Sequence, residues 1–172
     1  MFMTEHVEYT VSSERELDAL AAKVAVSLPD RLVVALIGTL GAGKTRWVQG
    51  LAEALGVPRE QVTSPTFVLS QEYVGTRLVR HVDLYRIADE DEFWELGAEE
   101  WFTGDGITCI EWADRWIECL PPDRLEVHLE ILGPTERRVT LRGTGPASQS
   151  IVERLANTQA PMNYSPEPGR QG

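Results

Sequence analysis

The segment GTLGAGKT (Gly38–Thr45) constrains the fold of this chain more than any other stretch. It matches the pattern G-x-x-x-x-G-K-[ST] in full. The apolar run LVVALI (Leu32–Ile37) precedes it, which is typical of a parallel strand buried on both faces. A helix from about Lys44 to Leu55 follows and is ended by Gly56 and Pro58. Strand, loop and helix in this order predict an α/β domain of the P-loop NTPase type.

The residue types of the loop explain how it would hold a nucleotide. The glycines let the backbone curl so that successive N–H groups converge on phosphate oxygens. The helix that follows adds the positive end of its dipole. Lys44 supplies a cation for the β and γ phosphates, and the Thr45 hydroxyl is placed to ligate Mg²⁺. The GTPase motifs D-x-x-G and N-K-x-D do not follow the loop, so ATP is favoured.

A magnesium ion between two phosphates usually takes a carboxylate from the end of a neighbouring strand. Two acids are candidates for this role. Glu111 closes the buried run ITCIE, and Asp83 closes the more interrupted run LVRHVD. The alternative for each is a cap on the turn or helix that follows. Glu111 is the better candidate, because its run is the more convincingly buried strand and would place it at the carboxyl edge of the sheet, where ligands of open α/β sheets bind.

The segment TSPTF (Thr63–Phe67) lies between the loop helix and the next strands. P-loop proteins often place a segment that senses the γ-phosphate there. Ser64 and Thr66 would present hydroxyl groups to the phosphate or the attacking water. The alternative is a local turn of the Ser/Thr type that leads into a strand.

The remaining patterns predict a mixed, mostly parallel sheet flanked by helices, with antiparallel hairpins, in one domain that spans residues 1–143. A capping box at Ser13 and Glu16 starts the first helix. The other expected elements are a strand near Val7–Val11, hairpins around Gly75-Thr76 and Gly133-Pro134, one or two short helices in ADEDEFWELGAEEWF, a strand in GITCIEW and a brief helix in ADRWIECL. Residues 144–172 are expected to form a tail with one short helix around Ser150–Leu155 and a disordered end.

The composition limits which binding partners and which cellular compartment we expect for this protein. The net charge of −11 disfavours direct binding to nucleic acid, since Lys and Arg supply most of that affinity. Such acidity suits either plain solubility or docking to a basic protein surface. No run approaches the ~18 apolar residues of a membrane span. With only Cys109 and Cys119 and no signal-peptide pattern, we expect a cytoplasmic protein without membrane contact.

Other conspicuous side chains carry weaker signals. His81 and His128 lie in strand-like stretches and are interpreted as ordinary polar positions. No cysteine cluster has zinc spacing. Four tryptophans are expected to pack short helices onto the sheet, the alternative being an aromatic surface: Trp94, Trp101, Trp112 and Trp116.

The motifs IGTLGAGKT, SPTFVL, HVDLYRI, ELG and CIEWADR, in this order, resemble those of the TsaE family. The resemblance covers roughly Val7 to Gly143. It implies a small P-loop ATPase of bacterial tRNA threonylcarbamoyladenosine biosynthesis, slow by itself and dependent on ATP and Mg²⁺. It also implies action on the TsaB–TsaD transferase pair between turnovers, with tRNA held by the partners.

The resemblance assigns roles to matching residues. Lys44 and the backbone of Thr39, Leu40, Gly41, Ala42, Gly43, Lys44 and Thr45 would hold the phosphates. Thr45 and Glu111 would ligate Mg²⁺, and Asp83 would be an essential acid near the metal and the water. Ser64 and Thr66 would belong to the switch-like segment, and Trp112 would adjoin the nucleotide. Glu14 and the Gly133–Thr135 turn, with Pro134 at its centre, would flank the adenine.

Two departures from the family loop G-D-L-G-A-G-K-T-T stand out. Thr39 replaces the acid and is expected on the γ-phosphate side, while Arg46 replaces the second Thr. Neither change removes a group that the phosphate and metal chemistry requires. Two other functions remain open at this point: a nucleotide-dependent adaptor without hydrolysis, and a small-molecule kinase with Arg137 and Arg138 over the transferring phosphate.

Overall fold

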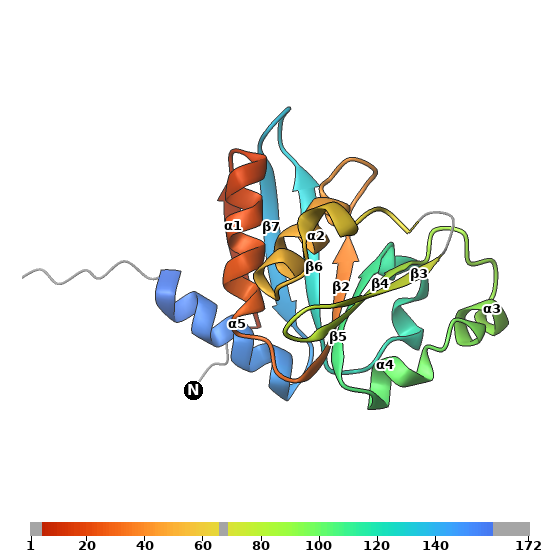
Figure 1. The fold of residues 1–172 in the computed structure, drawn as a ribbon. Helices are drawn as coiled ribbons and strands as arrows, with labels where there is room; N and C mark the ends of the chain where they lie inside the picture. Colours follow the sequence, from red (N-terminus) through yellow and green to blue (C-terminus); the bar gives the residue numbers. More distant parts are fainter. Residues whose placement is uncertain (1–4, 66–68, 160–172) are drawn as a thin grey trace, which may run out of the picture.

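The computed structural model describes residues 5–65 and 69–159, and within them the apolar run before the loop forms β2 (Arg31–Ile37), the middle strand of a seven-stranded sheet (Figure 1). The strand order is β1-β7-β6-β2-β5-β4-β3. The other strands are β1 (His6–Val11), β3 (Ser70–Val74), β4 (Leu78–Asp83), β5 (Gly106–Glu111), β6 (Arg124–Ile131) and β7 (Arg137–Gly143). The helices are α1 (Glu14–Ala25), α2 (Lys44–Ala54), α3 (Glu90–Glu95), α4 (Glu99–Thr103) and α5 (Pro146–Gln159), with 3-10 segments η1 (Arg59–Gln61) and η2 (Ala113–Cys119).

The sheet is mixed, as the sequence predicts. Parallel pairing joins its four central strands, β6, β2, β5 and β4. Antiparallel pairing adds β7 and β1 on one side and β3 on the other. Among the described strands, parallel and antiparallel pairings are therefore equal in number, three of each. The predicted hairpins are confirmed as β3–β4 and β6–β7.

Helices cover the two faces of the sheet unequally. Helices α1, α2 and α5 pack on one face over a large apolar cluster, which includes Val34, Trp47 and Leu141 (Figure 1). On the other face, α3, α4 and η2 cover β2, β5 and β4 through a smaller cluster around Phe93 and Trp101. Strand β2 is buried on both faces for this reason, which explains its continuous apolar sequence.

Local signals place the helix starts. The side chain of Ser13 accepts a hydrogen bond from the backbone N–H of Glu16 at 3.1 Å, which confirms the N-cap of α1. The acidic segment forms two short helices, with Asp89 as the N-cap of α3. Segment η2 is a 3-10 helix with a kink at Trp116. Three of the four tryptophans named above pack around Phe93, namely Trp94, Trp101 and Trp116.

The tail contains more structure than its composition indicates. Helix α5 runs for 14 residues from Pro146, and buries Ile151, Val152 and Leu155 against β7, β1 and β6. It belongs to the same apolar cluster as α1 and α2. The expected disordered end lies outside the described residues. Within the described part, no helix has the length and apolar character to cross a lipid bilayer.

Candidate nucleotide site

The site lies where the parallel strands end. The loop after β2 leads into α2, and Glu111 and Asp83 are the last residues of the neighbouring strands β5 and β4. These two acids are register partners, so their side chains leave the sheet on the same face. Parallel pairing of β2, β5 and β4 therefore brings together a loop and two acids that lie far apart in the sequence.

A cavity of about 420 Å³, named the main cavity because it contains both acids and Lys44, opens between these elements. Six residues predicted for catalysis or for binding by their side chains line it: Lys44, Thr45, Ser64, Asp83, Glu111 and Trp112. Leu40, Gly41 and Gly43 of the loop also contribute. Sequence reasoning missed Tyr85 and Arg86 as lining residues, although both belong to the quoted motif HVDLYRI.

Thr45 and Glu111, the predicted magnesium ligands, are in direct contact. The Thr45 hydroxyl donates to Glu111 Oε1 at 2.8 Å, with Oε2 at 3.1 Å. Glu111 is buried, and His81 Nε2 contacts its Oε2 at 2.7 Å. The interpretation of His81 as an ordinary polar position is therefore wrong, because its side chain is fully buried against a site residue.

Lys44 is held close to its own loop. Its Nζ donates to the carbonyl oxygens of Gly38 at 2.5 Å and Thr39 at 3.0 Å. The same ammonium lies 3.8 Å from the centroid of the Trp112 ring, a cation–π geometry. Burial lowers the pKa of Lys44, and the negative charge of Glu111 opposes that shift.

Asp83 is a buried carboxyl group with a fixed orientation. Burial raises its pKa, and the charge of Glu111 adds to the rise, while the backbone N–H of Tyr85 opposes it by donating to Oδ1 at 2.8 Å. A carboxylate with a raised pKa is a better base near neutral pH. Asp83 therefore combines a fixed orientation with a basicity above that of an exposed aspartate.

The backbone of Trp112 explains why its ring reaches the cavity. The residue has φ 57° and ψ 35°, a left-handed conformation that side chains other than glycine adopt at a cost of about 1–3 kcal/mol. This turn directly after Glu111 places the indole beside Lys44 and Tyr85, whose ring centroid is 4.9 Å away. The expected position of Trp112 at the nucleotide site is thus consistent with the geometry.

A second, smaller pocket of about 160 Å³ lies on the other side of the loop. The residues expected around the adenine, Glu14 and Pro134, both line it, as does Ala42. Gly41, Gly43 and Arg46 line both hollows, so the loop forms the wall between them. A nucleotide with its phosphates in the larger cavity and its base in the smaller one would lie across this wall.

Arg137 of β7 holds the loop in place. Its guanidinium donates to the carbonyl oxygens of Ala42 at 3.1 Å and Gly41 at 3.2 Å. It also donates to Gly133 at 2.8 Å and Glu136 at 2.9 Å in the turn between β6 and β7. The side chain thereby joins the loop after β2 to the turn that lines the smaller pocket.

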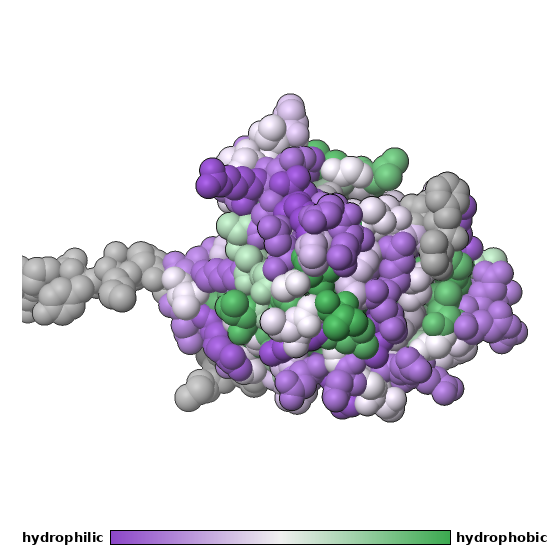
Figure 2. Space-filling view, viewed as in Figure 1, coloured by the Kyte–Doolittle hydropathy of each residue, from purple (hydrophilic) through white to green (hydrophobic). Residues whose placement is uncertain are grey.

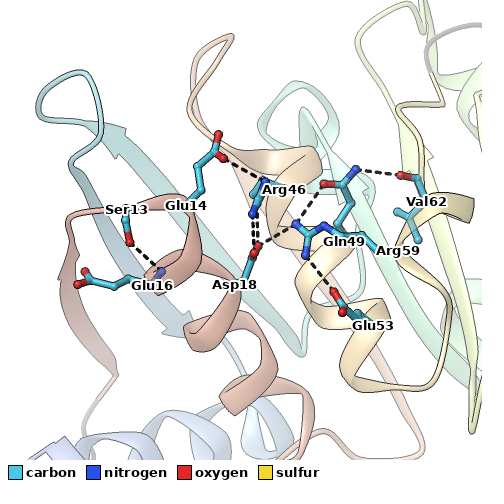
Figure 3. A network of polar contacts seen from close by, with 9 residues as sticks. All are labelled: Ser13, Glu14, Glu16, Asp18, Arg46, Gln49, Glu53, Arg59 and Val62. Atoms are coloured by element: carbon cyan, nitrogen blue, oxygen red, sulfur yellow. Dashed lines mark hydrogen bonds and ion pairs between the residues drawn. The ribbon is translucent and has the colours of Figure 1, made fainter.

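Arg46 takes part in a network of charges between α1, α2 and η1 (Figure 3). It contacts Asp18 at 2.6 Å and Glu14 at 3.1 Å. Arg59 contacts Asp18 at 3.0 Å and Glu53 at 3.0 Å (Figure 3). Burial alone would raise the pKa of Asp18, but hydrogen bonds from both arginines lower it. The arginine that replaces a family threonine is therefore used to join helices.

One expected residue lies at a different hollow, and another lies outside the described residues. Thr39 lines a hollow with His128 and Leu129 and is not among the residues that line the main cavity, so its place on the γ-phosphate side stays a prediction. Its carbonyl oxygen accepts a hydrogen bond from the Lys44 ammonium. Thr66 lies outside the described residues, whereas Ser64 lines the main cavity.

The donor atoms of the cavity suit a magnesium ion. Among the described residues no cluster of three or more His, Cys, Asp or Glu side chains is suited to a metal. Mg²⁺ does not need such a cage, because it keeps several waters and takes one or two carboxylates together with phosphate oxygens. The hydroxyl of Thr45 and the carboxylate of Glu111 are hard oxygen donors at one wall of the cavity, so they fit this ion.

Comparison with known proteins gives a consistent result. The chain is 39% identical over 148 residues to the Bacillus subtilis tRNA threonylcarbamoyladenosine biosynthesis protein TsaE, covering 86% of this chain and 91% of that protein. It is 40% identical over 114 residues to the TsaE protein of Treponema pallidum, covering 66% and 84% of the two chains. The TsaE protein of Aquifex aeolicus is 38% identical over 136 residues, which cover 78% and 94%.

The fold has a solved counterpart as well. The crystal structure of Bacillus subtilis YdiB matches with a TM-score of 0.75 and 29% identity, covering 93% of this chain and all of that chain. The family model described as threonylcarbamoyl adenosine biosynthesis protein TsaE matches residues 11–139. The matched region contains every described residue that lines the main cavity. The chain therefore belongs to the TsaE family.

Proposed function

We propose that this protein is a cytoplasmic, Mg²⁺-dependent ATPase of tRNA threonylcarbamoyladenosine biosynthesis. Its family supports the pathway, since the relatives described above carry that role in their names. The observation that carries the enzymatic part is the convergence of Lys44, Thr45, Asp83 and Glu111 on one cavity beside a complete phosphate loop. Such a set supplies phosphate binding, metal ligands and a base.

Each residue has a task in this proposal. Lys44 and the loop N–H groups would bind the phosphates, while Thr45 and Glu111 would hold the metal. Mg²⁺, when bound, neutralises charge on the β and γ phosphates. Asp83 orients the attacking water and accepts its proton, for which its raised pKa suits it. Trp112 and Tyr85 exclude bulk water from one side of the cavity.

The proposed partners are a protein pair of the TsaB and TsaD type, with tRNA reached only through the complex. The net charge of −11 supports a protein partner over direct tRNA binding, because phosphates repel an acidic surface. The face in Figure 2 is mainly hydrophilic and its apolar patches are separate from one another. ATP turnover would then reset the transferase pair between rounds of modification.

The geometry speaks against the kinase alternative. Arg137 is bound to loop and turn carbonyls, and Arg138 pairs with Glu8 and Glu130. Both guanidinium groups are therefore already engaged by protein oxygens, which makes a role over a transferring phosphate less favoured. The adaptor alternative differs from our proposal only in hydrolysis, so an experiment that counts turnovers separates them.

The proposal is tested by reconstituting the modification of tRNA with excess substrate and limiting TsaB–TsaD pair. With this protein and ATP, we expect many modified tRNAs per transferase pair. With Lys44→Ala, or with a non-hydrolysable ATP analogue, we expect the reaction to stop after about one round. Equal yields with ATP and the analogue would favour the adaptor, and equal yields without the protein would exclude both roles.

A further inference from the structure

His81 is a buried side chain that no step of the proposed function uses. It lies on β4 two residues before Asp83, so both side chains leave the strand on the same face. Its ring is fully buried, and Nε2 lies 2.7 Å from Glu111 Oε2 on the adjacent strand β5. We expect a buried histidine in contact with a carboxylate of the site to have a role besides packing.

The contact has a defined direction. An ionised carboxylate only accepts hydrogen bonds, so the hydrogen belongs to His81 Nε2. Glu111 also accepts from the Thr45 hydroxyl at 2.8 Å. The carboxylate is thereby held from two sides, by a strand residue and by the first turn of α2. His81 Nδ1 is buried and has no hydrogen-bond partner among the described residues, so the Glu111 contact is its principal anchor.

We propose that His81 is the positioning residue of the metal site, which fixes the Glu111 carboxylate in the orientation that Thr45 and Mg²⁺ share. This inference rests on the proposed function, because it requires that Glu111 binds the metal. The terminal torsion of a glutamate is broad, so without a second hydrogen bond its carboxylate rotates through many orientations. Loss of such outer partners typically weakens metal binding about 10–100-fold.

The chain offers a matched comparison for this contact. His128 on β6 makes the same kind of contact, with its Nε2 3.0 Å from Glu126 Oε2. Neither His128 nor Glu126 lines the main cavity, and His128 is partly exposed. A general effect of removing a histidine–glutamate pair would therefore occur at both positions, whereas an effect on the metal site would occur only at His81.

The test measures how much Mg²⁺ tightens nucleotide binding, using calorimetric titration with ADP in the presence of Mg²⁺ or of EDTA. The gain in affinity is compared for the natural protein, His81→Leu, His81→Asn, His81→Gln and the control His128→Leu. Glutamine places an amide N–H near the position of Nε2, whereas asparagine is too short to reach Glu111. Circular dichroism and thermal melting establish that each variant is folded.

We expect the Mg²⁺-dependent gain to fall about 10-fold or more in His81→Leu and His81→Asn. It should be largely kept in His81→Gln and unchanged in His128→Leu, and affinity in EDTA should change little. If His81→Leu does not fold, the comparison of His81→Asn with His81→Gln tests the proposal. An equal Mg²⁺-dependent gain in affinity in these two variants, whether kept or lost, would overturn the positioning role. If Mg²⁺ does not tighten the binding of ADP to the natural protein, the proposed metal site itself is overturned.

Discussion

Two residues, Gly43 and Arg137, determine the conformation of the phosphate loop. Gly43 has φ 111°, and a Cβ there would meet Leu17 at 2.9 Å, so this position requires glycine. Arg137 then fixes the curled loop by donating to two of its carbonyls. A guanidinium can do this because it carries five N–H donors in a planar fork. The loop is thus shaped by its glycines and held by a distant side chain.

We predict that Arg137→Lys weakens ATP binding about tenfold and lowers the free energy of unfolding by about 1–3 kcal/mol. A lysine keeps the charge but cannot contact the loop and the Gly133 turn at once. Isothermal titration and urea unfolding measure the two effects. Arg138→Lys is the control, since Arg138 is an exposed side chain that pairs with Glu8 and Glu130. Equal behaviour of the two variants would contradict the role of Arg137.

The site was predictable where its residues are close in sequence or follow a strand. The loop and the acids Asp83 and Glu111 were found because a complete motif and strand ends carry clear signals. His81 was not, because a histidine in a strand pattern resembles any polar position. Its partner is 30 residues away and meets it only through the β4–β5 pairing. The spacing of two between His81 and Asp83 was the one available signal.

At the level of elements, helix α5 shows where composition misleads. A segment rich in Gly, Pro, Ser and Gln resembles a tail, yet Ile151, Val152 and Leu155 form a helical apolar face. Pro146 suits the first turn of a helix, where its missing N–H is no loss. Asp123 secures this end by accepting from the backbone N–H groups of Ala147 at 2.8 Å and Ser148 at 3.0 Å.

We predict that Leu155→Ala lowers the free energy of unfolding by about 2–4 kcal/mol, because it leaves a cavity against β7 and β1. Asn157→Ala on the exposed face of the same helix should change it by less than about 0.5 kcal/mol. Chemical denaturation of both variants measures the difference. A small effect for Leu155→Ala would mean that α5 is a detachable tail and not part of the core.

At the scale of the whole molecule, the residues that form the apolar core and the residues of the candidate site lie in different parts of the sheet. The strands and helices form two apolar clusters, one on each face, and the cavity lies at the carboxyl edge between them. The charge network of Arg46 and Arg59 joins α1, α2 and η1 (Figure 3). The candidate site thus combines a loop bound by Arg137 with two acids at the ends of β4 and β5.

ATP turnover with Mg²⁺, measured with and without the TsaB–TsaD pair, tests the proposed function most directly. We predict slow turnover alone, clear stimulation by the pair, and a fall of about two orders of magnitude or more in Glu111→Ala. Glu130→Ala, an exposed acid on β6, should retain the natural rate. Turnover that stays negligible with the pair, or that survives in Glu111→Ala, would contradict the assignment of this site as a partner-driven ATPase.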